Sequence, residues 1–108
     1  MKTEWWYDDA SYHLDKTQVY LARLTVRDDG TAQLVTDGNA YEFENEEEAS
    51  IWLTDEEYSV LEVLIEDLQE QGLPVDPRLE ALAYGPKDGA DHPMVIVLGS
   101  VQRTAAPG

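Results

Sequence analysis

The sequence predicts a single α+β domain, in which an antiparallel β-meander of about four strands has two or three helices packed on one face. Three observations lead to this fold class. Apolar and polar residues alternate early in the chain, turn-forming glycines interrupt the alternation, and a run of apolar residues at helical spacing follows. With 108 residues, the chain is long enough for one hydrophobic core and too short for two domains.

The meander is predicted from three short segments. Side chains alternate over residues 18–27, which is typical of a strand with one buried face. Asp28-Asp29-Gly30 follows, and an Asp-Gly pair favours a hairpin because the turn requires the positive φ that glycine adopts freely. Residues 31–36 are the expected returning strand. A second turn at 37–39 leads to a third strand over 40–44.

Two helices are expected after the meander. Asn45 is a suitable N-cap for a short helix whose first turn holds three glutamates. Residues 54–57 have the sequence of a capping box and predict the start of a longer helix that ends at Gly72. The apolar side chains expected to hold the helices on the sheet are Trp52, Tyr58, Leu61, Leu64, Ile65 and Leu68.

The two ends of the chain are less regular. Residues 4–14 are rich in aromatic side chains and are compatible with a strand, an irregular arm, or both. Asp76-Pro77 predicts the start of a short helix, and the apolar run 94–98 predicts a central or well-covered strand. The domain is expected to span residues 1–102, with 103–108 as a flexible tail.

Charge is the most unusual property of the composition. Seven Lys and Arg stand against 23 Asp and Glu, for a formal net charge of −16. Between Arg27 and Arg78 there are sixteen acidic residues and no basic one. Because such a field repels phosphates, the composition argues against direct binding to nucleic acid or to anionic membranes, and it favours a basic protein partner.

Other features concern location. The sequence contains no cysteine, which excludes disulfides and thiolate chemistry, and no apolar run approaches the roughly 18 residues of a membrane span. The first residues lack the apolar stretch of a signal peptide. We therefore expect a soluble, cytoplasmic protein.

No catalytic residue, metal site or cofactor is predicted. A catalytic triad would need His13 or His92 with a serine, and none of the serines lies in a Gly-x-Ser-x-Gly context. Glycine-rich phosphate-binding motifs are also missing. Histidine and carboxylates that could bind a metal occur in two clusters, neither with the spacing of a known metal-binding loop. These clusters are His13 with Asp8, Asp9 and Asp15, and His92 with Asp88 and Asp91.

The residues expected to bind a partner are acidic and aromatic. Glu62, Glu66 and Glu70 follow one another at helical spacing without a lysine to pair them, and like charges so placed cost about a few tenths of a kcal/mol per pair. The stripe therefore does not serve helix stability. The other expected contacts are Glu46, Glu47, Glu48, Trp5 and Trp6, since tryptophan is enriched at interfaces. The alternative for the N-terminal aromatic residues is that two belong to the core and one is a half-exposed surface residue.

The acidic stretch 42–70 admits three explanations, namely solubility, docking of a basic protein, and mimicry of nucleic acid by carboxylates. The second gives the predicted function, a non-catalytic accessory or interaction protein. One alternative is an inhibitor that mimics nucleic acid and occupies the groove of a nucleic-acid-binding protein. Another is a small enzyme or metal-dependent binder, which requires a concave pocket that gathers a histidine with several acids.

One segment resembles a known group of proteins. The pattern Ala49-x-x-Trp52-Leu53-x-Asp55-Glu56-x-Tyr58, after a meander with Asp-Gly-Thr at 29–31, resembles small uncharacterised acidic proteins of cyanobacterial type. The resemblance covers about the middle half of the chain. Its motifs are a turn, a cap and a helix face, so it implies no activity and no site residue.

Overall fold

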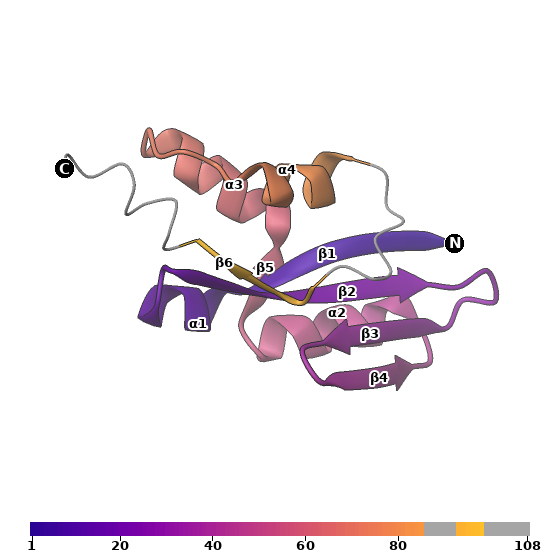
Figure 1. Ribbon diagram of the computed structural model, residues 1–108. Coiled ribbons are helices and arrows are strands. Elements are labelled where there is room, and N and C mark those ends of the chain that lie inside the picture. The colour runs from indigo at the N-terminus through magenta and orange to yellow at the C-terminus, as the bar shows by residue number, and fades with distance from the viewer. Residues whose placement is uncertain (86–92, 99–108) are drawn as a thin grey trace.

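The computed structural model describes residues 1–85 and 93–98, which form an α+β fold around an antiparallel sheet (Figure 1). Five strands lie in the order β4-β3-β2-β1-β5, and β6 pairs with the start of β2. The elements are β1 (Lys2–Asp8), α1 (Asp9–Leu14), β2 (Gln18–Val26), β3 (Ala32–Thr36), β4 (Asn39–Phe43), α2 (Glu46–Asp55), β5 (Tyr58–Val60), α3 (Leu61–Glu70), α4 (Pro77–Tyr84) and β6 (Val95–Val97). The predicted fold class and the meander of β2, β3 and β4 are confirmed.

Both predicted hairpin turns are present. Gly30 and Gly38 adopt φ values of 90° and 83°, a region that side chains with a Cβ rarely enter. In the first turn the Asp29 carboxylate accepts a hydrogen bond from the backbone N–H of Thr31 at 3.0 Å. These local contacts fix the register in which Leu24 faces Leu34 across β2 and β3.

The N-terminal aromatic segment forms both a strand and a helix. β1 lies between β2 and β5, so it is an interior strand of the sheet. It ends at Asp8, whose carboxylate accepts hydrogen bonds from the backbone N–H and the hydroxyl of Ser11 and so caps α1. The strand and the aromatic arm were open alternatives, and the structure contains the strand followed directly by a short helix.

The helices cover both faces of the sheet, whereas the sequence pattern predicted one covered face. Trp5 and Tyr7 of β1 belong to a cluster with α3 and α4, and Trp6 packs on the other face, against a cluster with α2. In β2 the adjacent residues Leu21 and Ala22 are both buried, one in each cluster. Neighbouring strand residues face opposite sides, so two buried neighbours require two covered faces.

The predicted capping box at residues 54–57 does not form. α2 continues through Asp55, and the Thr54 hydroxyl donates to the carbonyl O of Ser50 inside that helix, 2.9 Å away. Glu57 then takes a φ of 62°, and the chain enters the short strand β5, which pairs with β1. α3 therefore begins six residues later than predicted, at Leu61 instead of Asp55, and Tyr58 packs with α2 instead of with α3. The end of the helix at Gly72, with φ of 72°, is as predicted.

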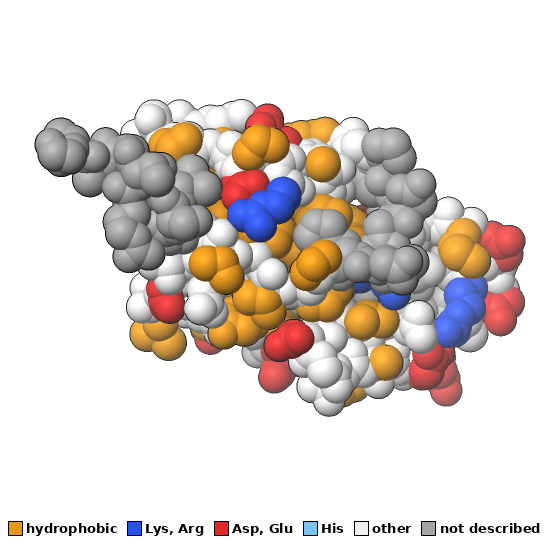
Figure 2. Space-filling view, viewed as in Figure 1, with side chains coloured by type: hydrophobic (Ala, Val, Ile, Leu, Met, Phe, Trp, Pro, Cys, Tyr) orange, Lys and Arg blue, Asp and Glu red, His pale blue; other side chains and the backbone are white. Residues whose placement is uncertain are grey.

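α4 begins at Pro77 with Asp76 as its N-cap, as predicted, but β6 is shorter and less covered than expected. Ile96 is 1% exposed while Val97 is 52% exposed, so β6 buries only one of its faces. Figure 2 shows hydrophobic side chains gathered on this side of the molecule, around β6. The expected tail at 103–108, and most of the loop before β6, lie outside the described residues.

Candidate functional site

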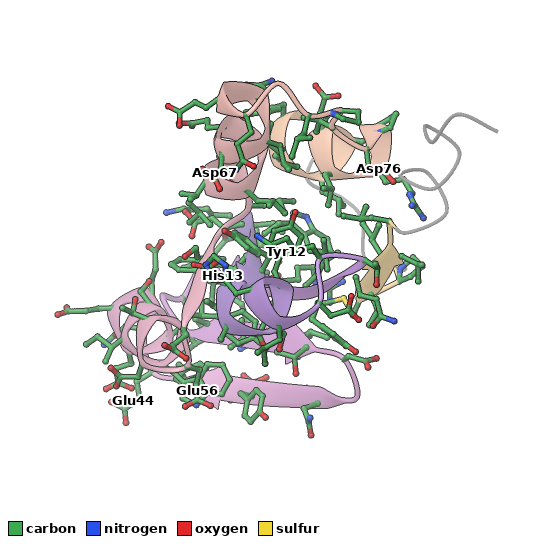
Figure 3. The ribbon with its side chains drawn as sticks, turned by 90° about the vertical axis from the view of Figure 1, so that its left-hand side faces the viewer. Tyr12, His13, Glu44, Glu56, Asp67 and Asp76 are labelled. Atoms are coloured by element: carbon green, nitrogen blue, oxygen red, sulfur yellow. The ribbon has the colours of Figure 1, made fainter. Side chains whose placement is uncertain are left out.

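A groove of about 580 Å³ lies between α1 and α3, and we call it the α1–α3 groove. Figure 3 shows Tyr12 and His13 of α1 on one side of it and Asp67 of α3 on the other. Its lining is mostly apolar, with charged groups at the rim. The lining residues are Tyr7, Asp9, Tyr12, His13, Lys16, Val63, Asp67, Leu68, Gln71, Leu73 and Pro74.

One wall of the groove follows from the way the Asp8 cap begins α1. Asp9, Tyr12 and His13 then fall three and four residues apart, which places them on one side of the helix. Tyr7 reaches the same wall from β1, and its ring meets that of Tyr12 edge-on, with centroids 6.2 Å apart and planes at 86°. This edge-to-face arrangement is favourable for aromatic pairs.

The other wall belongs to α3 and the turn after it. Leu64, Ile65 and Leu68 bury the inner face of α3, which leaves Val63 outside the core and 48% exposed. Leu73, just after the helix, is 47% exposed. The groove therefore offers two large apolar side chains to solvent.

Polar groups at the rim form a small network. Asp9 Oδ1 accepts a hydrogen bond from the Tyr7 hydroxyl at 3.3 Å and lies 3.5 Å from His13 Nε2. Lys16 Nζ lies 5.2 Å from the centroid of the Tyr12 ring, within range of a cation–π contact. On α3, the Gln71 amide donates to Asp67 Oδ2 at 3.3 Å.

The two tyrosine hydroxyls remain protonated well into alkaline pH. Burial raises the pKa of Tyr7, and the negative charge of Asp9 raises it further. Burial also raises the pKa of Tyr12, with a smaller effect from Asp67. Both hydroxyls are therefore hydrogen-bond donors at neutral pH.

The groove does not assemble the serine and histidine of a triad. Ser11 donates its hydroxyl to Asp8 at 2.9 Å, while His13 lies beside a different carboxylate, that of Asp9. The suggested metal ligands also separate, because Asp15 accepts hydrogen bonds from Thr17 instead of turning toward His13. Within residues 1–85 and 93–98 no group of three or more His, Asp or Glu is placed to hold a metal ion. The cluster around His92 lies outside the described residues.

The predicted acidic contacts lie on two sides of the sheet. Glu46, Glu47 and Glu48 form the first turn of α2, and Glu46 is 2.6 Å from Lys2 Nζ. Glu62, Glu66 and Glu70 lie on α3, which covers the opposite face. The six glutamates therefore do not make one surface, and only the α3 group lies on the helix that forms the groove.

Trp5 and Trp6 also lie on opposite faces of the sheet, and they differ in exposure. Trp5 is 2% exposed and belongs to the core, so it does not offer an exposed ring to a partner, contrary to its predicted role. Trp6 is half-buried against α2, and its Nε1 donates to Glu4 at 3.4 Å. The apolar contacts that sequence reasoning missed are Val63 and Leu73. The sequence contained a signal for each of them. Val63 is an apolar residue outside the apolar face of the predicted helix, and Leu73 is an apolar residue directly after the terminating Gly72.

No protein-family model, curated protein or solved structure matches this chain. The resemblance to cyanobacterial proteins thus remains an expectation. No helix in the described part of the chain is long and apolar enough to cross a membrane.

Proposed function

We propose that this chain is a non-catalytic interaction protein that docks a basic partner protein, with the α1–α3 groove and the glutamates of α3 as its contact surface. The observation that carries the proposal is the position of Val63. Its exposed side chain lines the groove and lies three residues before Glu66 and seven before Glu70, which places it beside these two glutamates on α3. An apolar centre with a charged rim is the usual composition of a protein interface.

The charges of α3 are open to a partner. The basic residues that form ion pairs in the described ranges contact acids elsewhere, since Lys2 pairs with Glu46, Arg27 with Glu42 and Arg78 with Asp76. Glu62, Glu66 and Glu70 have no ion pair within those ranges. Basic side chains of a partner would be attracted to this helix and would raise the association rate.

The groove also sets the orientation of the partner. Lys16 and His13 lie on the α1 wall, whereas the acidic stripe belongs to α3. A basic segment is therefore expected to place its cationic side chains over α3 and its apolar side chains against Val63 and Leu73. We also propose a cytoplasmic location, which the absence of cysteine supports.

The test is capture from a lysate of the native host at low and at high salt, with the captured proteins identified by mass spectrometry. The variant is E62Q/E66Q/E70Q, and the matched control is E44Q/E47Q/E48Q, which removes the same number of charges beside and on α2. We expect a basic protein to be retained at low salt by the wild type and by the control, and to be lost from the α3 variant. With the purified partner, the α3 variant should associate more slowly and with a flatter salt dependence.

Three results would contradict the proposal. Equal loss of the partner from both triple variants would show a net-charge effect without a defined surface. Full retention of the partner by V63S would show that the apolar groove is not part of the contact surface. Release of the partner by added DNA or RNA would favour the inhibitor that mimics nucleic acid, because a docking protein need not compete with a polynucleotide.

A further inference from the structure

A second cavity, which we call the aromatic pocket, lies at the end of α2 on the face of the sheet that α2 covers. Its volume is about 410 Å³, within the range of about 300–1,000 Å³ that is common for ligand sites. Four aromatic and three acidic side chains dominate its lining, together with Leu21 and smaller polar residues. The aromatic and acidic ones are Tyr20, Tyr41, Trp52, Tyr58, Asp8, Asp37 and Glu56.

Trp52 is the centre of the aromatic wall. Its ring centroid lies 4.9 Å from that of Tyr41, 6.1 Å from that of Tyr58 and 6.3 Å from that of Phe43. The four rings come from α2, β5 and the edge strand β4, and all of them are half-buried. The cluster thus fills part of the core and also presents aromatic surface to the pocket.

The carboxylates surround that aromatic surface. Asp8 lies opposite Tyr58 in the register of β1 and β5, so the two side chains are neighbours on one face of the sheet. The hydrogen bonds from Ser11 hold the Asp8 carboxylate in place. After burial, the charges of Asp8 and Glu56 are among the causes that raise the pKa of the Tyr58 hydroxyl. The field of these carboxylates therefore reaches the aromatic wall.

Two further features favour a positively charged group. Glu56 is the C-cap of α2, where the helix dipole is negative. Among the residues that the structure describes, the lining of the pocket includes no Lys, Arg or His, unlike that of the α1–α3 groove on the other side of the sheet. Figure 3 shows Glu56 and Asp67 far apart, on opposite sides of the sheet.

We infer that the aromatic pocket binds an arginine side chain of the basic partner protein, with the guanidinium against Trp52 and its N–H groups directed to Asp8 and Glu56. Arginine suits the site better than lysine because a planar guanidinium stacks on aromatic rings and donates to several carboxylate oxygens together. The inference rests on the proposed function for the identity of the ligand. It adds a second contact, on a different face from the α1–α3 groove.

The pocket is tested with a small probe that needs no partner. Acetyl-arginine amide is titrated into the protein, with acetyl-citrulline amide as the neutral analogue of the same shape. The readout is the indole N–H signal of each of the three tryptophans in NMR spectra. We expect a saturable shift of the Trp52 signal with the arginine probe, no comparable shift with the citrulline probe, and a constant signal from the buried Trp5.

Charge variants locate the contact. D8N/E56Q removes two charges from the pocket, and asparagine at position 8 remains a good N-cap. D28N/E47Q removes two charges elsewhere, from residues that do not line the pocket. We expect the first variant to bind the arginine probe about fivefold more weakly or worse, from two lost ion pairs, and the second to bind it as the wild type does.

The outcomes separate this inference from the proposed function. Equal shifts with citrulline, or equal weakening in both charge variants, would overturn the arginine site. If D8N/E56Q binds the probe weakly but captures the partner as the wild type does, the partner's arginine lies elsewhere, so the inference fails and the docking function stands. If the probe binds but the wild type captures no basic protein, the docking function fails, and the site is one for a free guanidinium compound.

Discussion

The guanidinium of Arg78 contacts the carboxylate of Asp76 through two nitrogens, with Nε 3.0 Å from Oδ1 and Nη2 2.6 Å from Oδ2. The same Nη2 donates to the carbonyl O of Val97 at 3.0 Å. Asp76 is also the N-cap of α4, since Oδ1 accepts from the backbone N–H of Arg78 at 2.8 Å. One carboxylate therefore begins a helix and, through Arg78, joins that helix to β6.

We expect Asp76→Ala to lower the free energy of unfolding by about 1–3 kcal/mol, because the change removes both the cap and the partner of the guanidinium. Asp76→Asn should lose less, since asparagine also caps helices. Urea denaturation measures both. Glu44→Ala, at an exposed position, is the control and should stay within about 0.5 kcal/mol of the wild type. Equal effects at positions 76 and 44 would contradict the role of Asp76.

The two adjacent tryptophans should respond differently to truncation. Trp5→Ala is expected to cost about 3–5 kcal/mol because it empties the centre of one cluster, whereas Trp6→Ala should cost less because that ring is half-buried. Denaturant unfolding of both variants gives the comparison. If Trp5→Ala does not fold, Trp5→Phe and Trp6→Phe preserve the order of the two losses. A larger loss of stability from the change at Trp6 than from the change at Trp5 would contradict the deeper burial of Trp5.

Glu57 is the one non-glycine residue with positive φ among those the structure describes. A left-handed conformation costs such a residue about 1–2 kcal/mol, so Glu57→Gly should stabilise the protein by up to about 1 kcal/mol after the added freedom of the unfolded chain is counted. The matched variant is Glu56→Gly, where φ is −89° and no strain is relieved. In thermal unfolding, the melting temperature of Glu57→Gly should lie above that of the wild type, and the melting temperature of Glu56→Gly should lie below it. A loss of stability in both would show that residue 57 is not strained.

Stability at high pH should depend on Tyr58. Burial, together with the charges of Asp8, Tyr41 and Glu56, raises the pKa of its hydroxyl from 10.0 to about 12. A raised pKa means that the folded state holds the proton more tightly, so the stabilisation is complete below about pH 10 and is lost as pH rises through 12.

The measurement is the free energy of unfolding of wild type and Tyr58→Phe over this pH range. The phenylalanine variant should lose less stability on alkalinisation. Tyr84→Phe, at a side chain that is 59% exposed, should follow the wild type. Parallel curves for wild type and Tyr58→Phe would contradict the assignment.

Some elements were predictable because their signals are local. The glycines at 30 and 38 require turns, Asn45 and Asp76 begin helices with their own side chains, and Gly72 ends one. Each signal depends on backbone groups within about four residues, which the sequence contains directly. The predicted capping box failed because a distant contact outweighed a local signal. The local pattern at 54–57 fits a helix start, but pairing of β5 with β1 is a distant contact and prevailed.

The candidate site was predictable only in part. The spacing of Glu62, Glu66 and Glu70 indicated one acidic helix face, and α3 contains it. The second wall of the groove required α3 to lie across the cavity from α1, and the pocket they line includes both Tyr12 and Asp67, which are more than fifty residues apart in the chain. Nothing near Tyr12 in the sequence specifies that neighbour, so the groove could not be foreseen.

By itself the sequence determined the turns, most of the helix ends and the excess of negative charge, because these depend on neighbouring residues or on composition. Only the tertiary structure decided where the charges and aromatic rings lie. Alternation along β1 requires Trp5 and Trp6 to face opposite ways, but it does not say which elements cover each face or how completely. The burial of each tryptophan is set by the position of β1 between β2 and β5, where Trp6 pairs with Val60. Burial depends on which distant segments pack together, and this is a property of the tertiary structure.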